Sequence, residues 1–167
     1  MPRQSDANKR KTGKEQYYTT PEVVDICLEL VQKHINLKGR KLLDIVCFDI
    51  EPKHPMVSQA NYLETNLDYK QFISITNPPF GRASSLAKKF FNHAAEHSDY
   101  ICYLIPKAWR KWSTQNALNK SFHLIKDIDV PDNCFYLPDG TKKDSSVLKT
   151  VFQIWEKRLI NREKIVI

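Results

Sequence analysis

The residues best suited to chemistry in this chain are four in succession, Asn77-Pro78-Pro79-Phe80. They follow the apolar run from Phe72 to Thr76, whose composition is typical of a strand. Because proline cannot donate a hydrogen bond to a neighbouring strand, two prolines in succession force a sharp turn where the strand ends. The restricted proline backbone also makes this turn rigid. We therefore expect a sharp, rigid turn at the carboxyl end of this strand.

A strand followed by Asn-Pro-Pro-Phe resembles motif IV of the class I S-adenosylmethionine-dependent amino-methyltransferases, above all those that act on adenine N6. The resemblance implies that the Asn77 side-chain oxygen and the Pro78 carbonyl accept the two hydrogens of the target amine. It also implies that Pro79 stiffens the turn and that Phe80 stacks on an extruded base. A proline-rich loop before a helix, without any catalytic task, is the alternative interpretation.

Three further segments follow the order of motifs in that family. Gln16 to Pro21 resembles a Tyr-Thr-Pro motif that lies against the methionine end of the donor. Phe48 to Pro52 resembles the second-strand motif, in which an acidic residue, Asp49 or else Glu51, accepts the ribose hydroxyls. Asn61-Tyr62-Leu63 takes the place of an Asp-Phe-Leu segment at the donor's adenine ring. The resemblance thus implies S-adenosyl-L-methionine as the cofactor, bound by Tyr18, Thr19, Pro21, Asp44, Asp49, Ile50, Asn61, Tyr62 and Leu63.

Taken singly, these segments have simpler interpretations as a capped helix, an acidic strand end and a surface turn. The chain also departs from the family where the glycine-rich donor loop belongs. Asp44, which should end the first strand, lies only five residues before Asp49, which should end the second. Two parallel neighbours need a crossover of a dozen or more residues. No glycine occurs between Gly39 and Gly81. Either the loop and its helix are absent, or a segment of about twenty residues is missing from the sequence.

A basic aromatic stretch, Lys107 to Trp112, follows an expected strand end at Pro106. Cations interleaved with indole rings suit contacts to phosphates and stacking on bases. The alternative is that one tryptophan packs in the core and the cations are solvated. The candidate interface also includes Arg82, directly after the Asn-Pro-Pro-Phe motif, and two lysines, Lys142 and Lys143, in the loop between the last two expected strands. An ordinary polar loop is the alternative interpretation of these two lysines. The full set of nucleic-acid-binding candidates is Arg82, Lys107, Trp109, Arg110, Lys111, Trp112, Lys142 and Lys143.

The elements that must position these residues begin with a helix. Thr20-Pro21 starts it and Lys38-Gly39 closes it, with a buried stripe of Val24, Cys27, Leu28, Val31 and Ile35. Lys41 to Ile50 is predicted as one buried strand. A second helix is expected from Ala83 to His97, followed by a strand from Tyr100 to Ile105.

Phe122 to Val130 and Val147 to Trp155 each alternate apolar and polar residues, which predicts two strands in an antiparallel hairpin. Strands alternating with helices indicate an α/β fold, here a Rossmann-like, mostly parallel sheet with helices on both faces. Ligands of such sheets bind beyond the carboxyl ends of the strands. The turn Asn77-Pro78-Pro79-Phe80, called the Asn77 turn below, falls at such an end. Residues 1–15 are expected to be a flexible basic arm and residues 16–167 a methyltransferase-like domain.

Composition sets the remaining expectations. The formal net charge of +7 favours a polyanionic partner, which we predict to be nucleic acid, with DNA favoured over RNA. No apolar run is long enough for a membrane span, so no membrane partner is expected. The four cysteines are widely spaced, which disfavours a metal site or disulfides and favours a cytoplasmic location with reduced thiols. A homodimer or a partner subunit remains open.

The sequence therefore predicts an adenine-N6 methyltransferase that acts on nucleic acid. The absent glycine-rich loop motivates a second hypothesis, a donor-deficient relative that binds nucleic acid or a partner subunit without catalysis. A third hypothesis keeps the chemistry and changes the acceptor. Asn-Pro-Pro-aromatic turns also occur in guanine-N2 and protein-glutamine methyltransferases.

Overall fold

The computed structural model describes residues 18–43, 48–49, 58–59, 62–79, 84–132, 134–136 and 149–167. The expected flexible arm lies outside these residues. In chain order the elements are β1 (Tyr18–Thr19), α2 (Pro21–His34), β2 (Leu42–Leu43), β3 (Phe48–Asp49), β4 (Ser58–Gln59), the 3-10 turn η2 (Tyr62–Glu64), β5 (Phe72–Thr76), α3 (Ser85–Ala94), β6 (Ser98–Pro106), the 3-10 turn η4 (Lys107–Arg110), α4 (Trp112–Ala117), β7 (Phe122–Asp129), β8 (Phe135–Tyr136) and β9 (Thr150–Lys157). Within the described residues, no helix has the length and apolar character of a membrane span.

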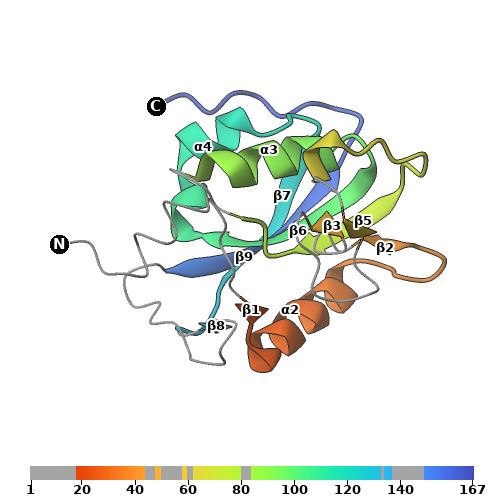
Figure 1. Cartoon of the computed structure of the whole chain (residues 1–167). Helices are drawn as coiled ribbons and strands as arrows, with labels where there is room; N and C mark the ends of the chain where they lie inside the picture. Colours follow the sequence, from red (N-terminus) through yellow and green to blue (C-terminus); the bar gives the residue numbers. More distant parts are fainter. Residues whose placement is uncertain are drawn as a thin grey trace.

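The main sheet has five strands in the order β2-β5-β6-β9-β7. β5 is parallel to both of its neighbours, β2 and β6. β9 is antiparallel to β6 and to β7, so that β7 runs in the same direction as β6. Helix α2 covers one face of the sheet, and α3 with α4 covers the other (Figure 1). The predicted α/β class, with a mostly parallel sheet and helices on both faces, is confirmed.

Helix α2 starts at Pro21 as predicted, but it ends at His34, before the predicted Lys38-Gly39 stop. The Asn36 side-chain oxygen accepts a hydrogen bond from the Lys38 backbone N–H at 3.1 Å, and such local bonds compete with the helix. Gly39 has a φ of +74°, in the left-handed region that favours glycine, within the turn that follows.

The buried stripe of α2 is narrower than its apolar pattern suggests. Val23, Cys27 and Val31 face the sheet, since residues four apart lie on one side of a helix. Val24 and Leu28, which were predicted to be buried, are exposed on its flank.

The run from Lys41 to Ile50 is not one buried strand, contrary to the prediction. β2 covers only Leu42–Leu43 and joins the main sheet beside β5, and Leu42 is 55% exposed. β3 belongs to a separate two-stranded sheet, in which it pairs in parallel with β4. With too few residues between β2 and β3 for a crossover, the two strands do not pair with each other in the described structure.

Helix α3 packs its inner side on an aromatic core. Phe91 is fully buried, and its ring contacts those of Tyr103, Trp109, Phe122 and Trp155 at centroid distances between 5.4 and 5.9 Å. These rings come from β6, η4, β7 and β9, so that one side chain joins three strands to the turn after β6. This layer fixes the position of the strands whose ends carry the candidate site.

The two predicted C-terminal strands, β7 and β9, pair antiparallel as expected. The chain between them is not a simple hairpin loop, because it contributes β8, which pairs antiparallel with β1 near the start of the described chain. Sequence alternation cannot reveal a two-residue pairing between segments so far apart in the chain.

Candidate functional site

The Asn77 turn lies at the carboxyl end of an interior strand. β5 spans Phe72–Thr76 as predicted, and hydrogen bonds to β2 and β6 hold it on both sides. Asn77 and Pro79 are half-buried, and Pro78 is buried. Phe80 lies outside the described residues. The turn is thus anchored by the sheet on one side and by a buried proline on the other, which limits its freedom to move.

Other chain segments meet at the same end of the sheet. Pro106, at the end of β6, pairs with Thr150, the first residue of β9. The Val130 backbone N–H, just after β7, donates to the Thr150 carbonyl at 3.3 Å. Because β5, β6 and β7 run in one direction, their carboxyl ends meet at one edge, where ligands of such sheets bind.

The N-terminal segment predicted to touch the donor also reaches this edge. Tyr18 and Thr19 form β1 beside β8, and the Thr20 backbone N–H donates to the Cys134 carbonyl at 2.8 Å. Pro21 occupies the first turn of α2 and is exposed. The structure therefore brings the Tyr-Thr-Pro segment to the end of the sheet where the Asn77 turn lies.

Tyr62, by contrast, lies at the opposite end of the sheet. Its ring packs on Phe90 and His93 in α3, and its hydroxyl lies 2.5 Å from Nε2 of His97. The His97 carbonyl accepts the backbone N–H of Phe72, the first residue of β5. Tyr62 is therefore a core residue beside the beginning of β5. Leu63 packs half-buried against the same core.

The donor half of the site does not fit the family's pattern. Asp44, Ile50, Asn61 and Arg82 lie outside the described residues, as do Lys142 and Lys143. Asp49 is described by its backbone alone, in β3, which stands apart from the main sheet. The short chain between β2 and β3 contains no glycine, so it cannot form the glycine-rich turn through which the family holds the donor.

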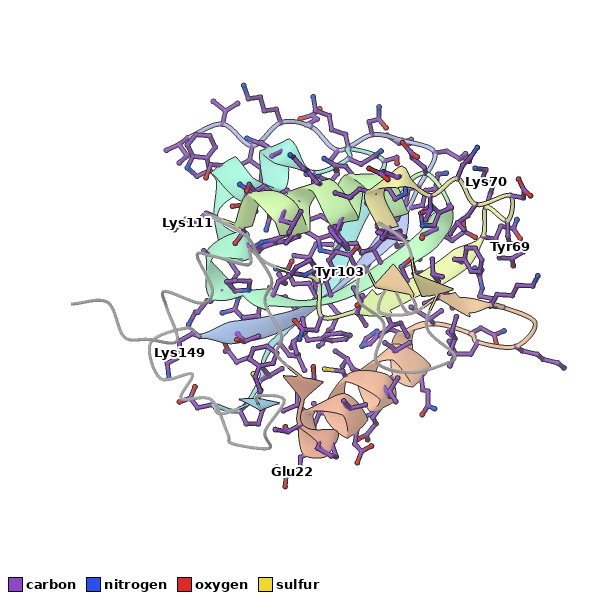
Figure 2. All side chains as sticks on the ribbon, in the orientation of Figure 1. Glu22, Tyr69, Lys70, Tyr103, Lys111 and Lys149 are labelled. Atoms are coloured by element: carbon purple, nitrogen blue, oxygen red, sulfur yellow. The ribbon has the colours of Figure 1, made fainter. Side chains whose placement is uncertain are left out.

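The basic aromatic stretch divides into a buried part and an exposed part. Trp109 is fully buried under α3, which matches the alternative that one tryptophan of this stretch packs in the core. Trp112 is 45% exposed and opens α4. Lys111 is exposed and forms no ion pair with a described residue. It lies on the same side of the molecule as Lys149 in the view of Figure 2.

Acidic partners offset much of the remaining positive charge. The Arg110 guanidinium bonds to Asp127, with its Nε 2.9 Å from Oδ1, and it also lies 3.2 Å from Asp129. Lys107 lies 4.0 Å from the same Asp129 carboxylate. The Lys149 ammonium bonds to both oxygens of the Asp132 carboxylate. Lys111 is thus the one cation of this set without an ion pair in the described structure.

Burial makes the described cysteines unreactive. It raises the pKa of the Cys27 thiol to about 12 and also raises the pKa of Cys102 and of Cys134. All three are free and buried. Across the described ranges, no three His, Cys, Asp or Glu side chains gather as a metal site would require.

Two polar residues outside the sequence motifs lie in β6 and β9, level with the last residue of β5. Tyr103 of β6 pairs with Thr76, and Gln153 of β9 pairs with Tyr103. Both are fully buried. Their signal in the sequence is a polar side chain in the middle of an otherwise apolar strand, which is informative because such groups are costly to bury.

Comparison with known proteins shows a likeness in fold. No protein-family model matches the chain, and no curated protein matches it. A "putative RNA methyltransferase" from Pyrococcus horikoshii has a TM-score of 0.63 and 15% sequence identity, over 87% of this chain and 88% of that one. A protein from Thermoplasma acidophilum has a TM-score of 0.59 and 16% identity, over 96% of this chain and 100% of that one. The chain thus has the Rossmann-like fold of the Pyrococcus horikoshii structure.

Proposed function

We propose that this chain is a nucleic-acid methyltransferase that acts on the exocyclic N6 amine of adenine, with the Asn77 turn as its acceptor site. The observation that carries the proposal is the position of this turn, anchored at the carboxyl end of an interior parallel strand. That edge is where the ligands of doubly wound sheets bind.

The chemistry follows from two oxygen acceptors on one rigid turn. The Asn77 side-chain oxygen and the Pro78 carbonyl accept the two hydrogens of the target amine. These bonds draw the nitrogen towards tetrahedral geometry, which returns its lone pair from the ring and makes it nucleophilic. Because the turn is rigid, the acceptors need no reorganisation when the reaction occurs. Phe80 stacks on the extruded base, as resemblance to the family suggests.

S-adenosylmethionine is the donor that the resemblance suggests. The donor site is incomplete by the family's pattern, so the acceptor half carries the proposal. RNA is the first substrate to test, since the Pyrococcus horikoshii protein is named for RNA. A single strand presents an adenine already unpaired, which lowers the cost of extruding it. DNA of the same sequence is the parallel arm.

The test is transfer of a labelled methyl group from S-adenosylmethionine to single-stranded RNA or DNA, with nucleosides identified by mass spectrometry. We expect N6-methyladenosine or its deoxy form with the wild type. Asn77→Ala should lower the rate at least about 100-fold, as the loss of one oxyanion-type partner does in other enzymes. Asn161→Ala, an exposed asparagine in the C-terminal tail, is the matched control and should keep the wild-type rate.

Wild-type activity in Asn77→Ala would refute the assigned chemistry. Methylated guanosine or protein glutamine in place of methylated adenine would instead support a different acceptor.

The second candidate is a donor-deficient protein that binds nucleic acid or a partner subunit. The separation of β3 from the main sheet and the absence of glycine between Gly39 and Gly81 favour it. Calorimetry with S-adenosylmethionine separates the two candidates. Micromolar affinity in the wild type supports the enzyme, whereas no binding in a protein that still binds single-stranded RNA supports the second candidate.

A further inference from the structure

A row of polar side chains crosses the sheet beside the Asn77 turn. Thr76 of β5 pairs with Tyr103 of β6, Tyr103 pairs with Gln153 of β9, and Gln153 pairs with Asp127 of β7. Tyr103 faces α3, because its ring packs on Phe91 with the centroids 5.8 Å apart. Figure 2 shows Tyr103 in the interior of the molecule, between α3 and the sheet. The row thus runs from the residue before Asn77 to the far edge strand.

The outer members of this row are bonded to one another. The Gln153 side-chain N–H donates to Asp127 at 2.7 Å, and its oxygen accepts the Trp155 indole N–H at 3.1 Å. Asp127 in turn accepts from Arg110 at the surface. Both ends of the Gln153 amide are therefore occupied, and neither contacts the Tyr103 hydroxyl.

Tyr103, unlike Gln153 and Asp127, forms no side-chain hydrogen bond within this row. It is fully buried, and its hydroxyl has no hydrogen-bond partner in the described structure. The indole N–H of Trp109 is also buried and without a partner, and the two rings lie 6.4 Å apart. Buried polar groups are nearly always bonded, so two orphaned donors close together require an explanation. Trp109 follows the carboxyl end of β6, and Tyr103 lies level with the last residue of β5.

Both groups can act as donors at physiological pH. Burial raises the pKa of the Tyr103 hydroxyl well above its usual value, so the group keeps its proton. The indole N–H is a donor only. The natural complement of this pair is a planar ligand that presents two acceptors.

We propose that Tyr103 and Trp109 read the target base, donating hydrogen bonds to its ring nitrogens while the Asn77 turn holds its amine. This inference rests on the proposed function and deepens it. Adenine has an acceptor nitrogen on each side of its amine, N1 and N7. The cytosine amine has one such neighbour, and the guanine amine has a protonated ring nitrogen on one side. A pair of donors therefore selects adenine among the bases that carry an exocyclic amine.

The test measures binding by fluorescence anisotropy. The probes are short uracil oligoribonucleotides carrying a single adenine, 1-deazaadenine, 7-deazaadenine or abasic site. We expect the wild type to bind the adenine probe at least about tenfold more tightly than either deaza probe, since each lacks one acceptor. Tyr103→Phe should lose this preference against one deaza probe and keep it against the other.

The matched control is Tyr62→Phe. Both tyrosines are buried, but the Tyr62 hydroxyl is bonded to His97 at the other end of the sheet. Tyr62→Phe should lower stability and leave both base preferences unchanged. Tyr103→Phe should unfold no more easily than the wild type, because it removes an unbonded polar group. A stability readout for both variants thus separates recognition from folding.

Two results would overturn the inference, and they differ. Equal wild-type affinity for the adenine and abasic probes would show that no base enters a site, and the proposed function would fail with it. A wild type that prefers adenine to the abasic probe, with both deaza preferences intact in Tyr103→Phe, would overturn the reading role of Tyr103 alone. The hydroxyl would then be satisfied by ordered water only.

Discussion

The Tyr62 hydroxyl lies 2.5 Å from Nε2 of His97, and both side chains are 2% exposed. Burial raises the pKa of Tyr62, so its hydroxyl stays protonated beside the imidazole. Burial, with help from His93 and Lys70, lowers the pKa of His97 to about 4 from 6.5. His97 is thus a neutral imidazole, and its hydrogen bond with Tyr62 holds η2 against the end of α3.

Stability should fall in acid because of His97. Between pH 6.5 and about 4 the unfolded chain binds a proton that the folded chain does not, so stability is lost as pH falls through that window. The loss attributable to His97 should reach at most about 3 kcal/mol. Urea unfolding of the wild type and His97→Gln at several pH values measures it. An equally steep acid loss in His97→Gln would place the effect elsewhere.

Arg162 should be the cation that matters most for folding in the C-terminal tail. Its guanidinium donates to the Phe122 carbonyl at 2.5 Å and the Gln115 carbonyl at 3.0 Å, and it lies over the Trp155 ring. Arg162→Ala should cost about 2–3 kcal/mol, since these carbonyls lose a charged donor. Arg162→Lys should recover only part, because an ammonium lacks the planar fork.

Chemical denaturation of both Arg162 variants gives these values. Arg158→Ala is the control, because Arg158 bonds at the surface to Glu156 and should contribute less than about 1 kcal/mol. A similar loss in both alanine variants would argue against a special role for Arg162.

Gln153→Glu should destabilise the protein in a pH-dependent way. The new carboxylate can still accept from Trp155, but it would face the Asp127 carboxylate at the place where Gln153 now donates. Repulsion should raise the folded-state pKa of one carboxyl, so the penalty is present at neutral pH and shrinks as pH falls. The stability difference from the wild type, followed from pH 7 downward by thermal unfolding, tests this. A difference that does not change with pH would contradict it.

Lys111 should contribute to nucleic-acid affinity more than its paired neighbours. It is exposed and forms no described ion pair, whereas Arg110 is held by Asp127 and Asp129. Lys111→Ala should reduce the slope of log affinity against log salt concentration by about 1. Binding of single-stranded RNA over a range of salt concentrations measures it. Lys157 is the last residue of β9, at the end away from Thr150 and the candidate site, so Lys157→Ala should leave the slope unchanged.

Elements with a long repeating pattern were predictable from the sequence. The start of α2, the bounds of β5 and the pairing of β7 with β9 follow from local rules: proline at a helix start, a proline stop after a strand, and alternation. The position of the Asn77 turn at the carboxyl end of a strand also follows, because consecutive α/β units place such turns at one edge.

The exposure of individual helix residues and the position of Tyr62 depended on how distant segments pack against one another. Val24 and Leu28 of α2 are as apolar as Val23 and Cys27. Only the angle at which the helix lies on the sheet decides that Val24 and Leu28 are exposed. Likewise, Tyr62 follows β4 as a donor motif would, yet contacts with α3 and His97 place it at the other end of the sheet.

The sequence by itself determined the fold class and the rigid Asn-Pro-Pro turn, because periodicity and proline geometry are local properties of the chain. Only the tertiary structure decided that Trp109 is buried, that β3 stands apart from the main sheet and that Tyr103 lies beside Thr76 with its hydroxyl unbonded. Each of these depends on strand register and side-chain packing between distant segments, and no short stretch of sequence contains that information.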